Sequence, residues 1–101
     1  MVIPKIDNIH SKILEAVNRP NALDMSTWHT CETTHCRAGW VVILAGDQGK
    51  KLEKQTSTLF AAMQIYRKSS PIEVHVPRFY ENNEKAMEDI KKCAEMEAKS
   101  P

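Results

Sequence analysis

The chain is poor in the residues that mark several specialised classes of protein. Its 101 residues include three cysteines, three glycines, and two each of tryptophan, tyrosine and phenylalanine. An odd and sparse set of cysteines does not build the disulfide framework of a small secreted domain, so we expect reduced thiols. The longest apolar stretch, residues 38–46, is about half the length that crosses a bilayer, and residues 1–7 lack the regions of a secretory signal. These absences predict a cytoplasmic protein with no membrane partner.

A strong charge of either sign is also missing. Fourteen Lys and Arg residues oppose thirteen Asp and Glu residues, which leaves a net charge of +1. This balance argues against a protein held to nucleic acid by general electrostatics. The charged residues make up 27% and the hydrophobic residues 42%, which is ordinary for a globular chain, so we expect a single helical domain over residues 1–101.

Apolar residues recur at helical spacing in several segments. The pattern predicts a first helix over 6–17, a short polar helix over 47–55, and a third over 59–66 that Thr56 or Ser57 caps. A last helix begins at Asn82 or Asn83, and its inner stripe carries small and apolar residues. Together with the central helix described next, these segments predict a mainly α fold, a compact bundle of four to five short helices.

The most apolar segment predicts a buried central helix over about 34–45. Thr33 or Thr34 can cap its start, and Gly46 suits the left-handed position that ends a helix. Because apolar residues cover almost all its faces, we expect the other helices to pack around it. Gly39 lies inside this helix and predicts a close backbone approach by a neighbouring helix. Residues 72–76 alternate apolar and polar side chains, which predicts a short strand or an extended segment.

Two imidazoles and two thiols lie within eight residues, at His29, Cys31, His35 and Cys36. All four are legitimate zinc ligands, so a zinc site or a zinc-dependent enzyme is one interpretation. A second interpretation is a small thiol enzyme, in which Cys36 is a thiolate at a helix start and His29 or His35 is its base. No recognisable motif supplies an oxyanion site or a group that orients the histidine. We therefore favour a third interpretation, with no cofactor, in which the cysteines pack as small apolar groups beneath the tryptophans.

The segment DMSTWHTCETTHCRAGWVVILAG, residues 24–46, resembles a family of short proteins found in bacteriophages, prophages and bacterial genomes. The shared pattern is Cys-x4-Cys-x-Ala-Gly-Trp, preceded by an aspartate and a tryptophan. Its positions in this chain are Asp24, Trp28, Cys31, Thr33 or Thr34, Cys36, Ala38, Gly39 and Trp40. A weaker similarity continues through residues 65–66 and 77–80. The family carries no established activity, so the resemblance implies only a small accessory protein of phage or prophage type.

The absence of a catalytic constellation favours a non-enzymatic protein of otherwise unknown function that acts by binding another protein or a second copy of itself. Long connections with aromatic residues often carry recognition, and residues 21–30 and 71–80 are the two candidates. We therefore predict that Trp28, His29, Phe79 and Tyr80 form the binding residues. The alternative is the metal-binding or thiol-dependent protein built on the four-residue cluster of histidines and cysteines.

Overall fold

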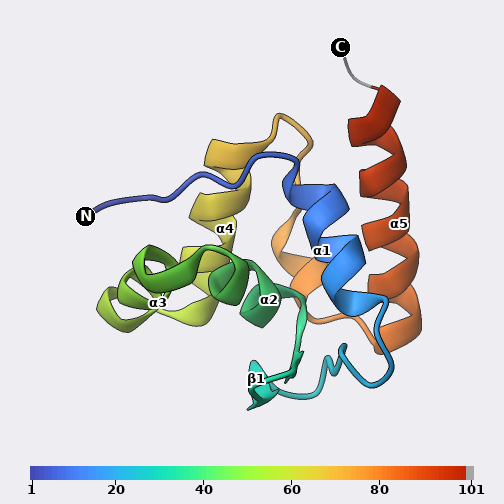
Figure 1. The fold of residues 1–101 in the computed structure, drawn as a ribbon, viewed down its shortest axis with the longest axis horizontal. Coiled ribbons are helices and arrows are strands. Elements are labelled where there is room, and N and C mark those ends of the chain that lie inside the picture. The colour runs from blue at the N-terminus through green and yellow to red at the C-terminus, as the bar shows by residue number, and fades with distance from the viewer. Residues whose placement is uncertain (100–101) are drawn as a thin grey trace.

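The computed structural model describes residues 1–99, which form five α-helices, a short 3-10 helix and a two-stranded hairpin (Figure 1). The predicted helical bundle is confirmed. In chain order the elements are α1 (Ile9–Val17), β1 (His29–Cys31), β2 (Thr34–His35), α2 (Arg37–Leu44), α3 (Gly46–Gln55), α4 (Thr58–Ser69), η1 (Val76–Phe79) and α5 (Asn83–Lys99).

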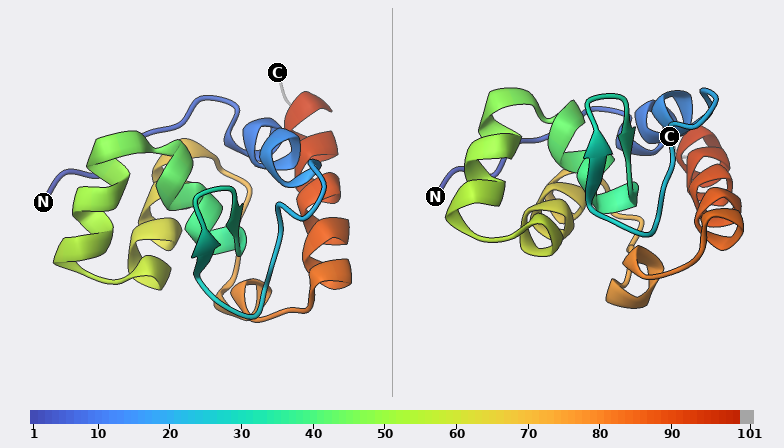
Figure 2. Two further views of the ribbon diagram at one scale, coloured as in Figure 1. Left: turned by 60° about the horizontal axis from the view of Figure 1, so that its bottom comes forward. Right: turned by 90° about the horizontal axis from the view of Figure 1, so that it is seen from below.

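Helix α2 is the centre of the molecule. Helices α1 and α5 pack together on one side of it, and α3 and α4 pack together on the other, as Figure 1 shows. Residues 37–42 of α2 are all buried, so the expectation of a buried central helix is correct. In Figure 2 the hairpin covers the start of α2, and the segment that carries η1 runs past it toward α5.

The central helix is shorter than the predicted 34–45 segment because its first residues form a strand. Thr34 and His35 make β2, which pairs with β1, and the helix begins only at Arg37. The predicted cap at Thr33 or Thr34 is wrong. Cys36 is the cap, and its Sγ accepts a hydrogen bond from the amide of Gly39 at 3.3 Å. Thr34 therefore lies in a strand and Cys36 at the helix cap, and neither belongs to the helix itself.

Gly39 allows the hairpin to lie directly on α2. A Cβ atom built there would overlap the carbonyl oxygen of Trp28 and would lie 3.0 Å from the Cβ of His35. The predicted close approach is correct, but the neighbour is the hairpin and not a helix. Gly46, with φ of 70°, takes the left-handed conformation that ends α2, as predicted, and α3 follows at once.

Helix ends are fixed by side chains from near and far. The cap of α4 is Ser57, one of the two predicted residues, and its hydroxyl accepts from the amide of Phe60 at 3.0 Å. Helix α1 starts at Ile9 instead of residue 6, and its cap comes from α5. Glu97 accepts hydrogen bonds from the amides of His10 and Ser11, each at 3.0 Å. A carboxylate at a helix N-terminus is favoured by the helix dipole, so this contact also ties α1 to α5.

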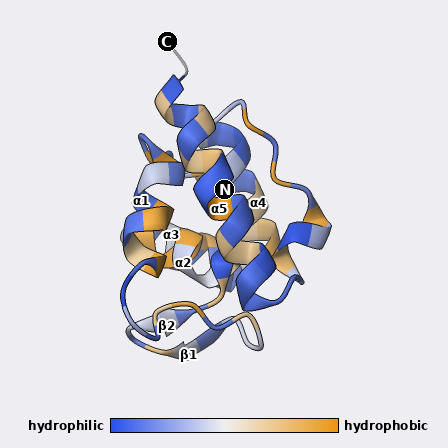
Figure 3. Cartoon of the chain, turned by 90° about the vertical axis from the view of Figure 1, so that its right-hand side faces the viewer, coloured by the Kyte–Doolittle hydropathy of each residue, from blue (hydrophilic) through white to orange (hydrophobic). Residues whose placement is uncertain are grey.

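The connection between α4 and α5 places two neighbouring aromatic residues on opposite sides of the chain. Residues 72–75 form no strand; His75 is extended, and Val76, the last residue of the predicted segment, begins η1 with Pro77 in its first turn. Phe79 then lies in the core, whereas Tyr80 is 63% exposed. Figure 3 shows how hydrophilic and hydrophobic residues alternate along the helices around this core. Within residues 1–99 we find no helix with both the length and the apolar character needed to cross a membrane.

Candidate binding pocket

A buried arginine joins three helices at the centre of the fold. Arg37 of α2 is fully buried and donates to Asp89 Oδ2 of α5 at 2.6 Å and to the Tyr66 hydroxyl of α4 at 3.1 Å. Its third nitrogen lies 3.8 Å from the sulfur of Cys93. All three nitrogens of the guanidinium group are therefore engaged.

The charges of this buried group stabilise one another. Burial alone would lower the pKa of Arg37, but the Tyr66 hydroxyl and the Asp89 carboxylate raise it above its ordinary value. Burial would raise the pKa of Asp89, but its hydrogen bond and charge pairing with Arg37 hold it below its usual range. Both groups stay ionised near neutral pH, so this centre is a buried ion pair whose partners are satisfied within the protein.

A second polar group links the hairpin to α3. His29 Nδ1 lies 2.7 Å from His35 Nδ1, and His29 Nε2 lies 2.6 Å from Glu53 Oε2. His35 Nε2 lies 2.9 Å from the carbonyl oxygen of Glu32 and donates to it, because a carbonyl oxygen can only accept. The two rings and Glu53 thus form one chain of polar contacts that runs from the hairpin to α3. The ring nitrogens are used in contacts that hold the hairpin against α3, so neither ring is presented as an open catalytic base.

The four residues considered as metal ligands point to different places. The histidine nitrogens face each other and Glu53, as described above. Cys36 is buried and caps α2, whereas Cys31 is exposed at the end of β1. Among residues 1–99, no group of three or more His, Cys, Asp or Glu side chains is arranged to hold a metal ion.

The three cysteines, all within the described residues, are free thiols in different environments. Burial raises the pKa of Cys36, which is the opposite of the activated thiolate considered from the sequence. Hydrogen bonding to Thr34 and Thr33 lowers the pKa of Cys31 to about 7. The prediction that Cys31 packs beneath the tryptophans is wrong because β1 directs it to the solvent, whereas Cys36 and Cys93 are buried as expected.

Three of the four predicted binding residues meet around one pocket. We call it the aromatic pocket, with a volume of about 340 Å³ and a lining of Met25, Ser26, Thr27, Trp28, Cys36, Phe79 and Tyr80. The rings of Trp28 and Tyr80 stand edge to face, with centroids 5.9 Å apart. The predicted residue His29 does not line this pocket, because its ring turns toward His35 and Glu53.

The two walls of the aromatic pocket come from distant parts of the chain. The wall around Trp28 is fixed to α2, since the Trp28 carbonyl accepts from the amide of Cys36 at 3.2 Å. The opposite wall follows η1, where Phe79 packs against Tyr66 with ring centroids 6.0 Å apart. The amide of Met25 donates to Asn83 Oδ1 at 2.8 Å and thereby joins the walls. The pocket is therefore preformed by the same contacts that hold the fold.

Two residues of this region could not be selected from the sequence. Met25 lines the pocket, and the spacing of the chain shows no reason to choose it over other methionines. Glu81 lies beside Tyr80 and pairs through Oε2 with Arg78 at 3.0 Å. Its other carboxylate oxygen is buried and has no hydrogen-bond partner within residues 1–99. The only sequence signal for Glu81 is that it follows an aromatic pair.

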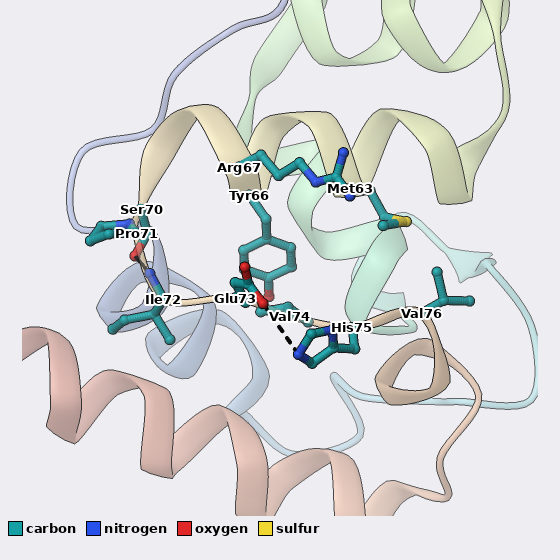
Figure 4. Close-up of a pocket in the computed structure, with 10 residues that line it drawn as sticks. All are labelled: Met63, Tyr66, Arg67, Ser70, Pro71, Ile72, Glu73, Val74, His75 and Val76. Atoms are coloured by element: carbon teal, nitrogen blue, oxygen red, sulfur yellow. Dashed lines mark hydrogen bonds and ion pairs between the residues drawn. The ribbon is translucent and has the colours of Figure 1, made fainter.

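A second hollow lies under the connection that leaves α4, and Figure 4 shows its lining. It is larger, about 540 Å³, and the Tyr66 ring forms its back. The Tyr66 hydroxyl at its back already accepts a hydrogen bond from Arg37. Glu73 and His75 pair with each other at 3.4 Å and are largely exposed. We therefore regard the aromatic pocket as the better binding site.

No protein-family model matches the chain, and searches among curated proteins and among solved structures return no match either. The kinship with phage-type proteins stays a prediction. Function is therefore inferred from the geometry of the chain itself.

Proposed function

We propose that this protein is a small non-enzymatic binding module, an accessory protein of phage or prophage type, that holds a segment of another protein in the aromatic pocket. The observation that carries the proposal is the convergence of Trp28, Phe79 and Tyr80 on one preformed hollow. Binding sites for protein segments are enriched in tyrosine and tryptophan, whose large rings lose little conformational entropy on binding. Tyr80 is 63% exposed. Exposure of its apolar ring to water is unfavourable in the free protein, and a partner that covers the ring removes this cost.

The chemistry of the other polar centres supports a binding role over catalysis. The guanidinium nitrogens of Arg37 all contact other groups of the protein. The His29–Glu53 pair is also bonded to neighbouring groups of the fold, a hydroxyl on the Glu53 side and, through His35, a backbone carbonyl. The thiol with the lowered pKa, Cys31, has no histidine among its hydrogen-bond partners. The rival proposal of a zinc or thiol enzyme predicts stoichiometric metal or covalent turnover, which metal analysis of the purified protein and a thiol titration would detect.

The test is affinity capture from the source organism with tagged wild-type protein, Tyr80→Ala and a matched control. Phe60→Ala is that control, because Phe60 is 40% exposed on α4 and does not line the aromatic pocket. We expect wild type and Phe60→Ala to retain the same saturable partner and Tyr80→Ala to lose it. A loss of about tenfold or more in affinity is typical of a central aromatic residue in an interface.

The capture must be read beside the stability of each variant. Both removed side chains are exposed, so we expect melting temperatures within about 2–4 °C of wild type. Equal retention by Tyr80→Ala and wild type would contradict the proposal. If a second copy of the same chain is the captured partner, the pocket is a self-association surface, and sedimentation of the purified protein will show a dimer that Tyr80→Ala abolishes.

A further inference from the structure

The aromatic pocket opens onto a group of carboxylates. The neighbouring surface, which we call the acidic rim, carries Asp24, Glu81 and Glu84 and shares Met25, Ser26 and Tyr80 with the pocket. Neither lining contains a lysine, arginine or histidine. A ligand in the pocket therefore meets aromatic rings on one side and negative charge on the other.

The carboxylates of the rim differ in how many hydrogen-bond partners they have. Asp24 accepts from the amide and hydroxyl of Ser26 and from the hydroxyl of Thr30, which lowers its pKa below the usual range. Glu81 uses one oxygen for Arg78 and leaves the other buried without a partner within the described residues. Arg78 divides its charge between two carboxylates, since its Nε also lies 3.7 Å from Asp89 Oδ1. An acceptor thus lacks a donor at the edge of an aromatic pocket.

We infer that the side chain received by the aromatic pocket is a cation, a lysine or arginine carried by the partner segment. This inference rests on the proposed function and names the chemistry of its ligand. An ammonium or guanidinium group is attracted to the faces of tryptophan and tyrosine within about 6 Å of the ring centroid. The methylene stem of the same residue packs against the rings, and its charged head reaches the carboxylates. A phosphate-bearing partner is disfavoured, because the rim would repel it.

The inference explains why the rim and the rings lie together. A purely apolar ligand would leave Glu81 Oε1 unpaired and would desolvate three carboxylates beside it, which costs free energy. A cationic head lowers both costs because it can donate to this unpaired oxygen and balances the negative charge of the rim. The contrast between a cationic and an apolar guest of equal length is therefore the decisive measurement.

The experiment uses four peptides, acetyl-Gly-Gly-X-Gly-Gly-amide, with lysine, arginine, norleucine or glutamate at X. Each is titrated into isotope-labelled full-length protein, and NMR follows the indole NH of Trp28, with Trp40 as an internal control because it is 6% exposed in the core. We expect saturable shifts at Trp28 with lysine and arginine, about tenfold weaker binding of norleucine, and no binding of glutamate.

Two variants separate the cation from the apolar contact. Glu81→Gln keeps the shape of the side chain and should reduce the affinity for the lysine peptide to that for norleucine. Glu88→Gln, on the exposed face of α5 and outside both linings, is the control and should leave every affinity unchanged. Equal affinities for lysine and norleucine would overturn the inference and leave the proposed binding function intact. No shift at Trp28 with any peptide would overturn both the inference and the pocket as a side-chain site.

Discussion

Two polar regions of the molecule differ in how completely their groups are paired. The region around Arg37 is buried, and every nitrogen of its guanidinium has a partner from another helix. The region around Tyr80 has an exposed ring, and one buried carboxylate oxygen of Glu81 has no hydrogen-bond partner within residues 1–99. A closed set of partners stabilises one fold, whereas an open set leaves interaction energy for a ligand. The first region therefore belongs to the architecture of the fold, and we propose the second as the binding surface.

The largest expected effect comes from removing Arg37. Arg37→Ala leaves the carboxylate of Asp89 and the hydroxyl of Tyr66 without their donor, and breaking a buried pair costs about 3–5 kcal/mol of folding free energy. Thermal denaturation followed by circular dichroism should show a melting temperature lower by more than about 12 °C, or no cooperative transition. The matched change is Arg78→Ala, which removes a half-exposed arginine from the same carboxylate and should cost less than about 1 kcal/mol. Equal costs for the two variants would abolish the distinction between the buried centre and the surface.

Gly39→Ala tests the contact that connects the two regions. The added methyl group meets the backbone carbonyl of Trp28, which cannot rotate away, so the hairpin must move off α2. We expect a loss of about 2 kcal/mol or more in the free energy of unfolding, measured by urea denaturation. The Trp28 wall of the pocket should shift at the same time, which should lower the affinity for the partner. Full partner affinity in a destabilised variant would show that the pocket does not depend on this packing.

A pH dependence should arise from His10, whose buried ring stacks on Tyr66 with centroids 5.4 Å apart. Burial lowers its pKa below 6.5, although the charge of Glu97 opposes part of the shift. As the pH falls below 6.5, the unfolded chain takes up this proton before the folded chain does, so stability decreases from about pH 7 downward.

The matched variant for this effect is His10→Phe, which keeps the stacking and cannot titrate. The melting temperature of this variant relative to wild type should rise as the pH is lowered from 7.5 to 5.5, because only the wild type loses stability through His10. A constant difference over this range would mean that His10 takes up its proton equally in the folded and unfolded chains.

Alkylation of the thiols should have the smallest effect on the fold. Cys31 is exposed with a pKa of about 7, whereas burial raises the pKa of Cys36 and of Cys93. Iodoacetamide at pH 7.5 should therefore modify one thiol per native chain and all three after denaturation, as mass spectrometry will count. Modification at Cys31 should leave the melting temperature nearly unchanged. Faster reaction of Cys36 than of Cys31 would contradict the assignment of Cys36 as a structural cap.

Most of the helices could be predicted from the sequence because helical periodicity is a local property. The apolar stripes and the caps at Ser57 and Asn82 agree with the structure, since each cap bonds to an amide three residues away. The hairpin could not be predicted, because strands of two and three residues carry no periodicity of their own. His35 pairs with residues 22–24 as well as with β1, so its conformation depends on tertiary contacts.

The candidate pocket was predictable only in part for the same reason. The aromatic residues at 28, 79 and 80 stand out in composition, and long connections are common sites of recognition. Their convergence needs the fold, which brings residues about fifty positions apart onto one pocket. The paired state of Arg37 was equally hidden. A single charge in an apolar helix requires a partner, but the sequence does not show that Asp89 supplies it.

The measurement that tests the central claim most directly is amide hydrogen exchange of wild-type protein with and without the captured partner. We expect added protection in residues 24–30 and 76–84, which form the aromatic pocket and the acidic rim, and unchanged exchange around the buried Arg37 centre. Protection confined to the hollow below residues 70–76, or to α3, would place the binding surface elsewhere and contradict the account.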